Sequence, residues 1–548
     1  MQRRLAPLPT LLVLLSTLAY YAFVVHNLSL AYLDFGDGNY LYISARMADG
    51  AALYSEILSP QPPLHLWAGA GIFKLTSAPL PGLWIARFYT ATLHVLTAAL
   101  VLCCSLSLFG RPREAALAYA LALFLPIGFW WTLGFQSEAT ALPLLLLAFY
   151  GQLRGGRGWM AAGGLAAAGA LLTNMTCLPY VILHSLSAAS LRRKHAPAFF
   201  LPLVGVYGGV AAILQWTTGG AFFTNIWRNQ VGSFPPNLWD YGPAKLLGNG
   251  MVIVDLEGAW ILLALGGMLA ATRLSVDPDT PLLAQQPGLR RYVLWVGVLH
   301  LGSILFMLKG GTANYIFMIA EPMVALFAAR AVGLLAGVWR RTIRDLHPAA
   351  LAARALLALT LACLLVVPTF RLHAAVWMTN WRTPPASQTL SALSRMDPTN
   401  SPEREVRRAL ALVESHARPG DLILAPPWYA FASRTRLPGD NCETYLIGIR
   451  YANLRAALAQ SGETLSAAVT RLGPAASSYA RDAVQQLAPV VEALNSRQVK
   501  VVFWQVDRGH PFYAIPELRQ ALEENYQRVP NFELQNANER LVAYLPRD

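Results

Sequence analysis

The sequence has little charge and little cysteine. Only 13% of its 548 residues are charged and its mean hydropathy is +0.40, whereas a typical soluble domain has about 25% charged residues. Its five cysteines show neither the spacing of metal ligands nor a disulfide framework. The apolar residues lie in long uncharged blocks. A soluble enzyme, a disordered chain and a disulfide scaffold are therefore excluded, and the sequence predicts a polytopic membrane protein.

The net charge of +13 does not indicate a nucleic-acid partner. Residues 1–369 contain 23 Lys and Arg against 13 Asp and Glu, so most of the excess belongs to the apolar part of the chain. The basic residues there lie between hydrophobic blocks, as topology signals do, and form no phosphate-binding stripe. We therefore expect no nucleic acid among the partners.

The apolar blocks predict the fold class. A helix needs about 20 apolar residues to cross a bilayer, and eleven blocks are predicted to do so. They are residues 9–30, 83–109, 115–132, 138–152, 158–173, 176–191, 197–216, 257–272, 292–309, 313–338 and 350–369. The expected fold is an α-helical polytopic membrane protein with about 11 transmembrane helices and a C-terminal extracytoplasmic α/β domain.

The basic residues predict the orientation. Six alternate gaps between the blocks hold 15 Lys and Arg against four Asp and Glu, and the positive-inside rule assigns such gaps to the cytoplasm. We expect a multi-pass protein of the plasma (inner) membrane with a cytoplasmic N-terminus and an external C-terminal domain. No convincing cleavage site follows the first block, which favours a retained helix over a signal peptide.

The chain divides into a membrane part and an external part. Residues 1–370 are the predicted transmembrane domain, with a first external loop at 31–82 and a second long external loop at 217–256. Residues 371–400 are predicted to form a linker at the membrane interface. Residues 401–548 predict an α/β domain. Its expected elements are helices at 402–417, 446–495 and 515–526, an apolar run at 421–425, a strand at 499–506 and a closing segment at 540–545.

Polar residues gather in the first external loop. Asp34 and Asp37 follow the first span directly, and Asp37 is placed to start an interfacial helix in which Tyr40, Leu41 and Ser44 share its face. A proline pair at 62–63 marks a second helix start. A carboxylate beside the bilayer surface can act as a general base on a hydroxyl while the leaving group stays anchored in lipid.

The order of residues in this loop resembles that of a known family. The string Asp37-Gly-Asn-Tyr40, then Gly50, Leu53-Tyr54, Glu56 and Gln61-Pro-Pro-Leu64, resembles the first external loop of the GT-C superfamily of integral-membrane glycosyltransferases. The likeness is to the glycosyltransferase family 39-like group, which includes protein O-mannosyltransferases and aminoarabinose transferases. A second match is Lys309-Gly-Gly-Thr-Ala-Asn314-Tyr315, followed by Glu321-Pro322; Ser137-Glu138 and Thr173-Asn174-Met-Thr176 look like weaker counterparts at two other external helix ends.

The resemblance implies a membrane glycosyltransferase that works on the extracytoplasmic face. Its donor would be a sugar on a polyprenyl phosphate, and its acceptor a hydroxyl of a glycan, lipid or protein, with inversion at the anomeric carbon. Members carry an essential acid in the first loop, commonly as an adjacent Asp-Glu pair. Here Gly36 takes the first of those positions and Asp37 the second, so either Asp37 or Asp34 is the expected base. The family's usual Lys-Pro-Pro reads Gln61-Pro-Pro, which removes one expected cation.

For each of these candidate residues there is also an interpretation that needs no catalytic role. Asp37 could serve only as an N-terminal helix acid, and Glu56 could be either a substrate or metal contact or a solvated loop acid. Lys309 is a candidate contact to the lipid phosphate, with snorkelling as the alternative. Glu138 complements a helix dipole without catalysis.

Five further residues are weighed in the same way. Asn314, Tyr315 and Tyr40 are candidate substrate contacts, although a tyrosine near an interface is usually an anchor. Arg46 is expected to pair with Asp49 rather than with the donor phosphate. Arg330 lies inside a span and needs a partner that the sequence does not reveal.

Two other functions stay open. A transporter or lipid flippase would show ionisable residues at mid-span and inverted repeats, and no repeat is visible. A non-catalytic membrane scaffold is the second alternative, because the adjacent Asp-Glu pair is missing. No dedicated metal site is expected. The loop acids could still hold a divalent cation, and no other cofactor is predicted.

Overall fold

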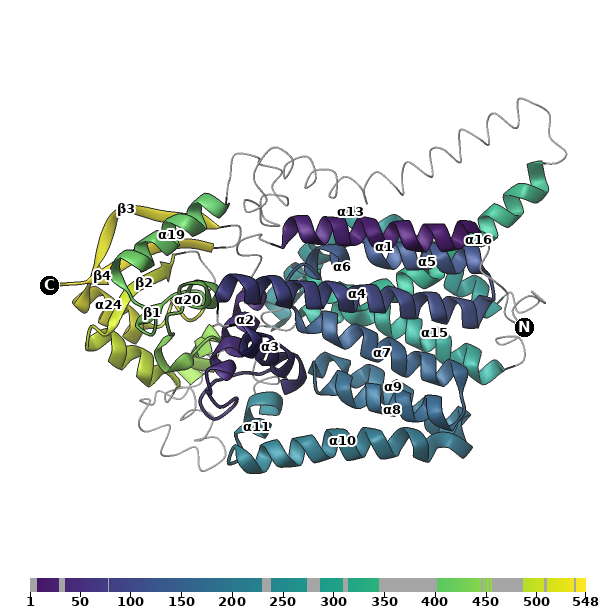
Figure 1. Ribbon diagram of the computed structural model, residues 1–548, viewed down its shortest axis with the longest axis horizontal. Helices are drawn as coiled ribbons and strands as arrows, with labels where there is room; N and C mark the ends of the chain where they lie inside the picture. Colours follow the sequence, from purple (N-terminus) through teal and green to yellow (C-terminus); the bar gives the residue numbers. More distant parts are fainter. Residues whose placement is uncertain are drawn as a thin grey trace.

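The computed structural model describes most of the chain. The described residues are 7–28, 35–76, 78–228, 238–273, 286–308, 314–343, 402–444, 447–448, 450–452, 454–455, 486–506, 510–536 and 539–548. Figure 1 shows a bundle of long helices with the sheet of the C-terminal region at one end.

The helices of the bundle coincide with ten of the eleven predicted spans. They are α1 (Pro7–Asn27), α4 (Pro79–Phe109), α5 (Pro112–Phe124), α6 (Pro126–Trp131), α7 (Ser137–Arg154), α8 (Arg157–Leu171), α9 (Leu178–Leu191), α10 (Ala196–Thr217), α13 (Leu238–Arg273), α15 (Pro287–Leu301) and α16 (Glu321–Ile343). Among the described residues, six helices are long and apolar enough to cross a membrane. The protein is therefore a polytopic helical membrane protein, as predicted. The span expected at 350–369 lies outside the described residues.

One predicted loop is largely a helix. The segment 217–256 was expected to be an external loop, but α13 begins at Leu238 and has 36 residues. At 1.5 Å per residue it is about 54 Å long, well beyond the hydrocarbon thickness of about 30 Å. Asp240, Gly248 and Asp255 interrupt the apolar pattern of its first half, which concealed the helix in the sequence.

The first external loop is also helical. It contains α2 (Phe35–Ala48) and α3 (Pro63–Leu75). Asp37 lies in the first turn of α2, as predicted, and Pro63 occupies the first position of α3, where its missing N–H costs no hydrogen bond. Tyr40, Leu41 and Ser44 are buried on the face of α2 that also carries Asp37.

A buried ion pair explains the arginine inside a span. Nη1 of Arg330, in α16, lies 3.1 and 3.2 Å from the two carboxylate oxygens of Glu114, in α5. The guanidinium also lies over the Phe109 ring, 5.3 Å from its centroid. Each charge is thus compensated by the other within the bundle, and the ion pair links α16 to α5.

The C-terminal region forms a four-stranded sheet in the order β1-β2-β4-β3. The strands are β1 (Leu422–Leu424), β2 (Val499–Gln505), β3 (Tyr526–Asn536) and β4 (Glu539–Pro546), with β1 parallel to β2 and the other two pairs antiparallel. The helices are α19 (Pro402–His416), α20 (Pro427–Ser433) and α24 (Pro516–Asn525). The predicted α/β character is confirmed. Much of the helix expected at 446–495 lies outside the described residues.

The C-terminal region packs closely on α2. In Figure 1, α20 lies beside α2 at the end of the bundle. A Cβ atom at Gly38 would lie only 2.7 Å from Cβ of Trp428, in α20. Only a residue without a side chain allows this approach, so Gly38 fixes how α2 meets the C-terminal region.

Candidate active site at the first external helix

Asp37 is fully buried and both of its carboxylate oxygens accept hydrogen bonds. Arg87, in α4, donates from Nη2 to Oδ2 at 2.9 Å, and the backbone N–H of Phe135 donates to Oδ1 at 2.6 Å. Arg87 itself is 1% exposed and also donates to the carbonyl of Leu28. Asp37 therefore joins α2 to α4 and to the turn before α7. Its predicted catalytic role stays a prediction.

A second carboxylate lies close by in a cluster of polar side chains. Oε2 of Glu138 accepts from the Ser137 hydroxyl at 3.2 Å, and Oε1 accepts from the Asn174 amide at 2.9 Å. The Ser137 oxygen also lies 3.3 Å from the Tyr40 hydroxyl and accepts from Asn174 at 3.1 Å. We call these four residues, all at most 7% exposed, the Glu138 cluster.

The local sequence places each member of the Glu138 cluster. Ser137 and Glu138 form the first turn of α7, where the helix dipole favours a carboxylate. Asn174 caps the short helix Met175–Cys177, because its Oδ1 accepts from the Thr176 N–H at 3.0 Å. That bond leaves the amide nitrogen to donate to Glu138. The two motifs that the sequence marked at separate helix ends thus meet in one site.

Tyr40 connects the cluster to further groups. Its ring stands edge to face against His65, with centroids 5.3 Å apart, and His65 pairs with Thr140 at 2.9 Å. Burial lowers the pKa of His65 to about 3, so this imidazole is neutral at physiological pH. Burial also raises the pKa of Tyr40 well above 10, and the nearby Glu138 and Tyr315 raise it further. Tyr40 therefore presents a neutral hydroxyl that can donate a hydrogen bond.

The C-terminal region reaches the same end of α2. Asn39 donates from Nδ2 to Oε1 of Glu443 at 2.6 Å, and the Glu443 carboxylate contributes to the raised pKa of Tyr40. Sequence analysis did not single out Glu443, because its neighbourhood depends on how the two regions pack. Its position places an acid of the C-terminal region beside the Glu138 cluster.

Of the other predicted site residues, Tyr315 lies near Tyr40, whose pKa it helps to raise, and Glu56 makes its described hydrogen bond outside the cluster. Glu56 is exposed and its carboxylate accepts from the Ala52 N–H at 2.8 Å, as expected for a turn-forming loop acid. The Tyr315 ring packs on Trp131 with centroids 5.3 Å apart. Asp34 and Lys309 lie outside the described residues, as does the side chain of Asn314.

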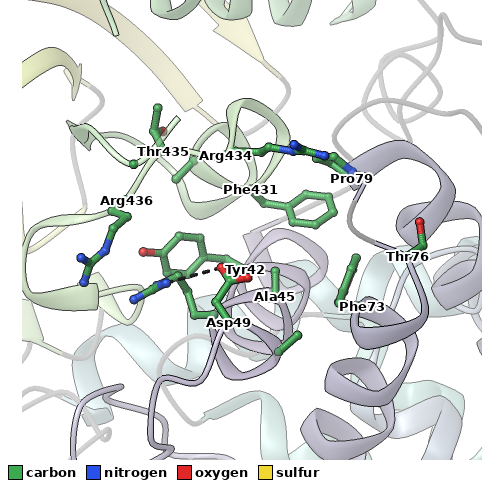
Figure 2. A pocket seen from close by; sticks show the side chains of 14 residues that line it. Tyr42, Ala45, Asp49, Phe73, Thr76, Pro79, Phe431, Arg434, Thr435 and Arg436 are labelled. Carbon is green, nitrogen blue, oxygen red and sulfur yellow. Dashed lines mark ion pairs between the residues drawn. The ribbon is translucent and has the colours of Figure 1, made fainter. Parts of the chain in front are cut away.

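Arg46 pairs mainly with the C-terminal region. Its Nε lies 3.0 Å from Oδ1 of Asp440, whereas the predicted partner Asp49 is 3.5 Å away. Both contacts exist, but the shorter one crosses to the C-terminal region. Arg46 and Asp49 line a cavity of about 390 Å³ between α2 and residues 420–436 (Figure 2). Among the described residues, no group of three or more His, Cys, Asp or Glu side chains could hold a metal ion. The divalent cation stays a prediction.

Comparison with solved structures shows which fold this is. No protein-family model matches the chain, and no curated protein matches it. The structure of ArnT from Cupriavidus metallidurans bound to undecaprenyl phosphate matches with a TM-score of 0.56 at 14% identity, over 98% of this chain and 97% of that one. Its apo form matches equally well, over 97% of each chain. The apo Archaeoglobus fulgidus oligosaccharyltransferase matches with a TM-score of 0.50 at 14% identity, over 95% of this chain and 73% of that one. The chain therefore has the GT-C fold that its first loop predicted.

Proposed function

We propose that this GT-C-fold protein is a membrane glycosyltransferase that moves a sugar from a polyprenyl-phosphate donor to an acceptor hydroxyl. The fold supports this proposal, because ArnT, which matches nearly end to end, was solved with undecaprenyl phosphate bound. The observation that carries it is the Glu138 cluster, in which three separate segments hold a carboxylate beside a tyrosine hydroxyl where the bundle meets the C-terminal region. The reaction is proposed for the extracytoplasmic face, with a cytoplasmic N-terminus.

Glu138 is the described carboxylate whose surroundings best suit a general base. Ser137 and Asn174, both neutral groups, donate to its two carboxylate oxygens and orient it. Asp37 instead forms a charge-assisted hydrogen bond with Arg87, which is roughly twice as strong as a neutral one. An acceptor hydroxyl would have to displace Arg87 or the Phe135 N–H to reach Asp37. Among the described carboxylates we therefore propose Glu138 as the base and a positioning role for Asp37; Asp34, the other first-loop acid that the resemblance implied, lies outside the described residues.

The proposed reaction is a single displacement. Glu138 takes the proton of the acceptor hydroxyl, whose oxygen attacks the anomeric carbon as the bond from that carbon to the phosphate oxygen breaks. The polyprenyl phosphate leaves as an anion, so little acid catalysis is needed at the leaving group. One displacement inverts the anomeric configuration. Lys309 and Tyr315 remain the proposed contacts of the donor, Lys309 as the cation for the lipid phosphate.

The experiment uses the purified protein in detergent with a panel of radiolabelled polyprenyl-phosphate hexoses and pentoses. With crude membranes as acceptor source, we expect one donor to lose its label to a new product of inverted anomeric configuration. Retention of configuration would contradict the single displacement. No consumption of any donor would contradict the transferase proposal itself.

The need for a divalent cation is tested in the same assay. EDTA would remove a cation held by the loop acids, and added Mg²⁺ or Mn²⁺ would restore activity. Activity that is unchanged by EDTA would mean that the residues of this chain stabilise the leaving phosphate without a metal ion.

A further inference from the structure

Two glutamates of different membrane helices meet inside the bundle, at the first turn of α6. Glu257 lies in α13 and Glu321 begins α16, and the two residues are only 1% and 2% exposed. The backbone N–H of Ile127 donates to Oε1 of Glu257 at 2.9 Å, and the N–H of Gly128 donates to Oε1 of Glu321 at 2.7 Å. Both helices thus hold the same turn of α6, each through one carboxyl group.

The contact between the two carboxyl groups requires a proton. Glu257 and Glu321 are hydrogen-bonded to each other through their side chains. Two ionised carboxylates can only accept hydrogen bonds, so one of the two groups must carry a proton to donate. If both were ionised, Oε2 of Glu257 would be a buried acceptor to which no described group donates. Carboxyl groups in direct contact share one proton because two like charges out of water repel strongly.

No cation within the described part of the chain forms an ion pair with either glutamate. The charged and titratable groups on the surrounding elements are His94 of α4, Glu114 of α5, Tyr315 of η5 (Asn314–Ile319), His300 of α15, and Asp255 and Arg330 of the two helices themselves. Arg330 pairs with Glu114 and follows Glu321 by nine residues, about 13 Å along the axis of α16. Asp255 is exposed. A proton is therefore the positive charge that keeps the two carboxyl groups together.

His94 is a second group at this place that can carry a proton. A Cβ atom at Gly128 would lie 1.9 Å from Oε2 of Glu321 and 3.5 Å from Cε1 of His94, so both side chains reach the same point. Nε2 of His94 lies 3.3 Å from the Leu123 carbonyl and must donate to it, because a carbonyl oxygen only accepts. Nδ1 is buried and has no partner among the described residues. A proton on Nδ1 would leave the bond between the two carboxyl groups without a donor, so the geometry assigns the proton to the acids.

We propose that Glu257 and Glu321 form a proton-binding site that holds one proton at neutral pH and so keeps α13 and α16 together on α6. Loss of the proton leaves two carboxylates in contact, and their repulsion weakens the hold of both helices on α6. This helix ends at Trp131, whose ring packs on Tyr315 with centroids 5.3 Å apart. The proton site therefore lies one short helix away from a proposed contact of the donor. The proposal does not rest on the transferase function, because the proton is measured without any donor.

The first test is infrared spectroscopy of the full-length protein in detergent at neutral pH. The carbonyl stretch of a protonated carboxyl group absorbs apart from the bands of ionised carboxylates. Difference spectra compare the wild type with Glu257→Gln, with Glu321→Gln and with the matched control Glu414→Gln, at an exposed site on α19. A glutamine at either buried position can donate to the remaining carboxylate, so both variants should fold, and thermal unfolding in the same detergent establishes that they do.

We expect the wild type to show a protonated carboxyl group that both buried variants lose and the control keeps. The control should lose only an ionised carboxylate. A wild type without this band would mean that the proton lies on His94 or that both glutamates are ionised, and either result overturns the proposal. A band that persists in a folded Glu257→Gln or Glu321→Gln variant would overturn it as well, because the proton would then belong to another group.

The second test follows thermal unfolding as the pH rises from about 6 to about 9. An unfolded chain releases its glutamate protons near pH 4.3, whereas the folded pair keeps one, so a rising pH favours the unfolded state. This proton alone should lower the folding equilibrium constant of the wild type about tenfold per pH unit until the pair itself ionises. Glu257→Gln and Glu321→Gln should lack this part of the decline, because a glutamine needs no proton to donate. Parallel pH profiles of the wild type and both variants would overturn the proposal.

Discussion

Arg87 and Asp37, 50 residues apart in the chain, form an ion pair of 2.9 Å in which neither side chain is more than 1% exposed. The pair fixes the first turn of α2 to α4, and α2 in turn carries Tyr40 to the Glu138 cluster and Tyr42 to the C-terminal region. Removing one partner of a buried pair lowers the free energy of unfolding far more than the pair itself raises it, because the remaining charge stays out of water. This pair therefore governs where α2 lies.

Removing one charge of this pair should destabilise the protein. We expect Asp37→Asn or Arg87→Gln to lower the free energy of unfolding by about 3–5 kcal/mol. The double variant should lose less free energy of unfolding than the sum of the losses in the two single variants, since it leaves no unpaired charge. Thermal unfolding in detergent measures the effect, with Arg519→Gln, at an exposed site on α24, as the control. Additive losses in the double variant would mean that the two charges do not interact.

Two adjacent glycines of α13 should differ sharply in their tolerance of a methyl group. A Cβ at Gly267 would lie 2.0 Å from the Phe327 carbonyl of α16, whereas a Cβ at Gly266 meets nothing within 4 Å. Gly267→Ala should therefore force α13 and α16 apart and destabilise the fold by about 1–3 kcal/mol. Gly266→Ala should be neutral or slightly stabilising. Unfolding curves of the two variants decide this, and equal stabilities would contradict the close packing of these helices.

The hydroxyl of Tyr40 and the amide of Asn174 should affect turnover more than folding. Tyr40→Phe keeps the ring contact with His65 and removes only the hydrogen bond to Ser137. Asn174→Ala removes the donor that orients Glu138. We expect kcat to fall about tenfold or more in each variant, with little change in KM for the donor. Tyr544→Phe, in β4, is the control for Tyr40→Phe. A rise in KM alone would show that these groups bind the donor without positioning the base.

The contact between Arg46 and Asp440 should weaken in acid. Burial raises the pKa of Asp440, but hydrogen bonds from Arg46, Tyr42 and Arg436 outweigh it and hold the pKa below its usual value. A carboxyl with a depressed pKa in the folded state contributes stability above its unfolded pKa of about 3.9. That contribution is lost as the pH falls through the lower folded value. We expect the unfolding temperature of the wild type to fall between pH 5 and pH 3 by more than that of Asp440→Asn. Equal shifts would contradict a role for this carboxylate in stability.

The sequence predicted elements whose determinants are local. Pro62 and Pro63 marked the start of α3, and the apolar runs at 421–425 and 499–506 contain β1 and β2. The expected elements did not include β3, an edge strand with a proline at 530 whose register with β4 shifts between Arg528 and Glu533. Proline is tolerated at a sheet edge, so this strand carries a residue that is rare within central strands.

The site was predicted only in part, because its geometry depends on contacts between distant segments. Glu138 and Asn174 were recognised at separate helix ends, but nothing local shows that they touch. In the same way, the partner of Arg330 is Glu114, 216 residues earlier in the chain. The sequence placed Asp37 in the first turn of a helix, but its pairing with Arg87 depends on how α4 packs against α2. The sequence motifs therefore identified the segments that form the site. Which of their residues contact one another depends on how the helices of the bundle pack.

The most direct test of the proposed site is donor consumption by Glu138→Gln. The variant keeps the size of the side chain and can still accept one hydrogen bond, so it should fold like the wild type. We expect loss of label from the polyprenyl-phosphate donor to fall by about 10² or more, the usual contribution of a general base. Glu414→Gln, at an exposed site on α19, should retain full activity. Consumption at the wild-type rate by Glu138→Gln, with activity abolished in a folded Asp34→Asn or Asp37→Asn variant, would contradict the assignment and return the base to the first loop.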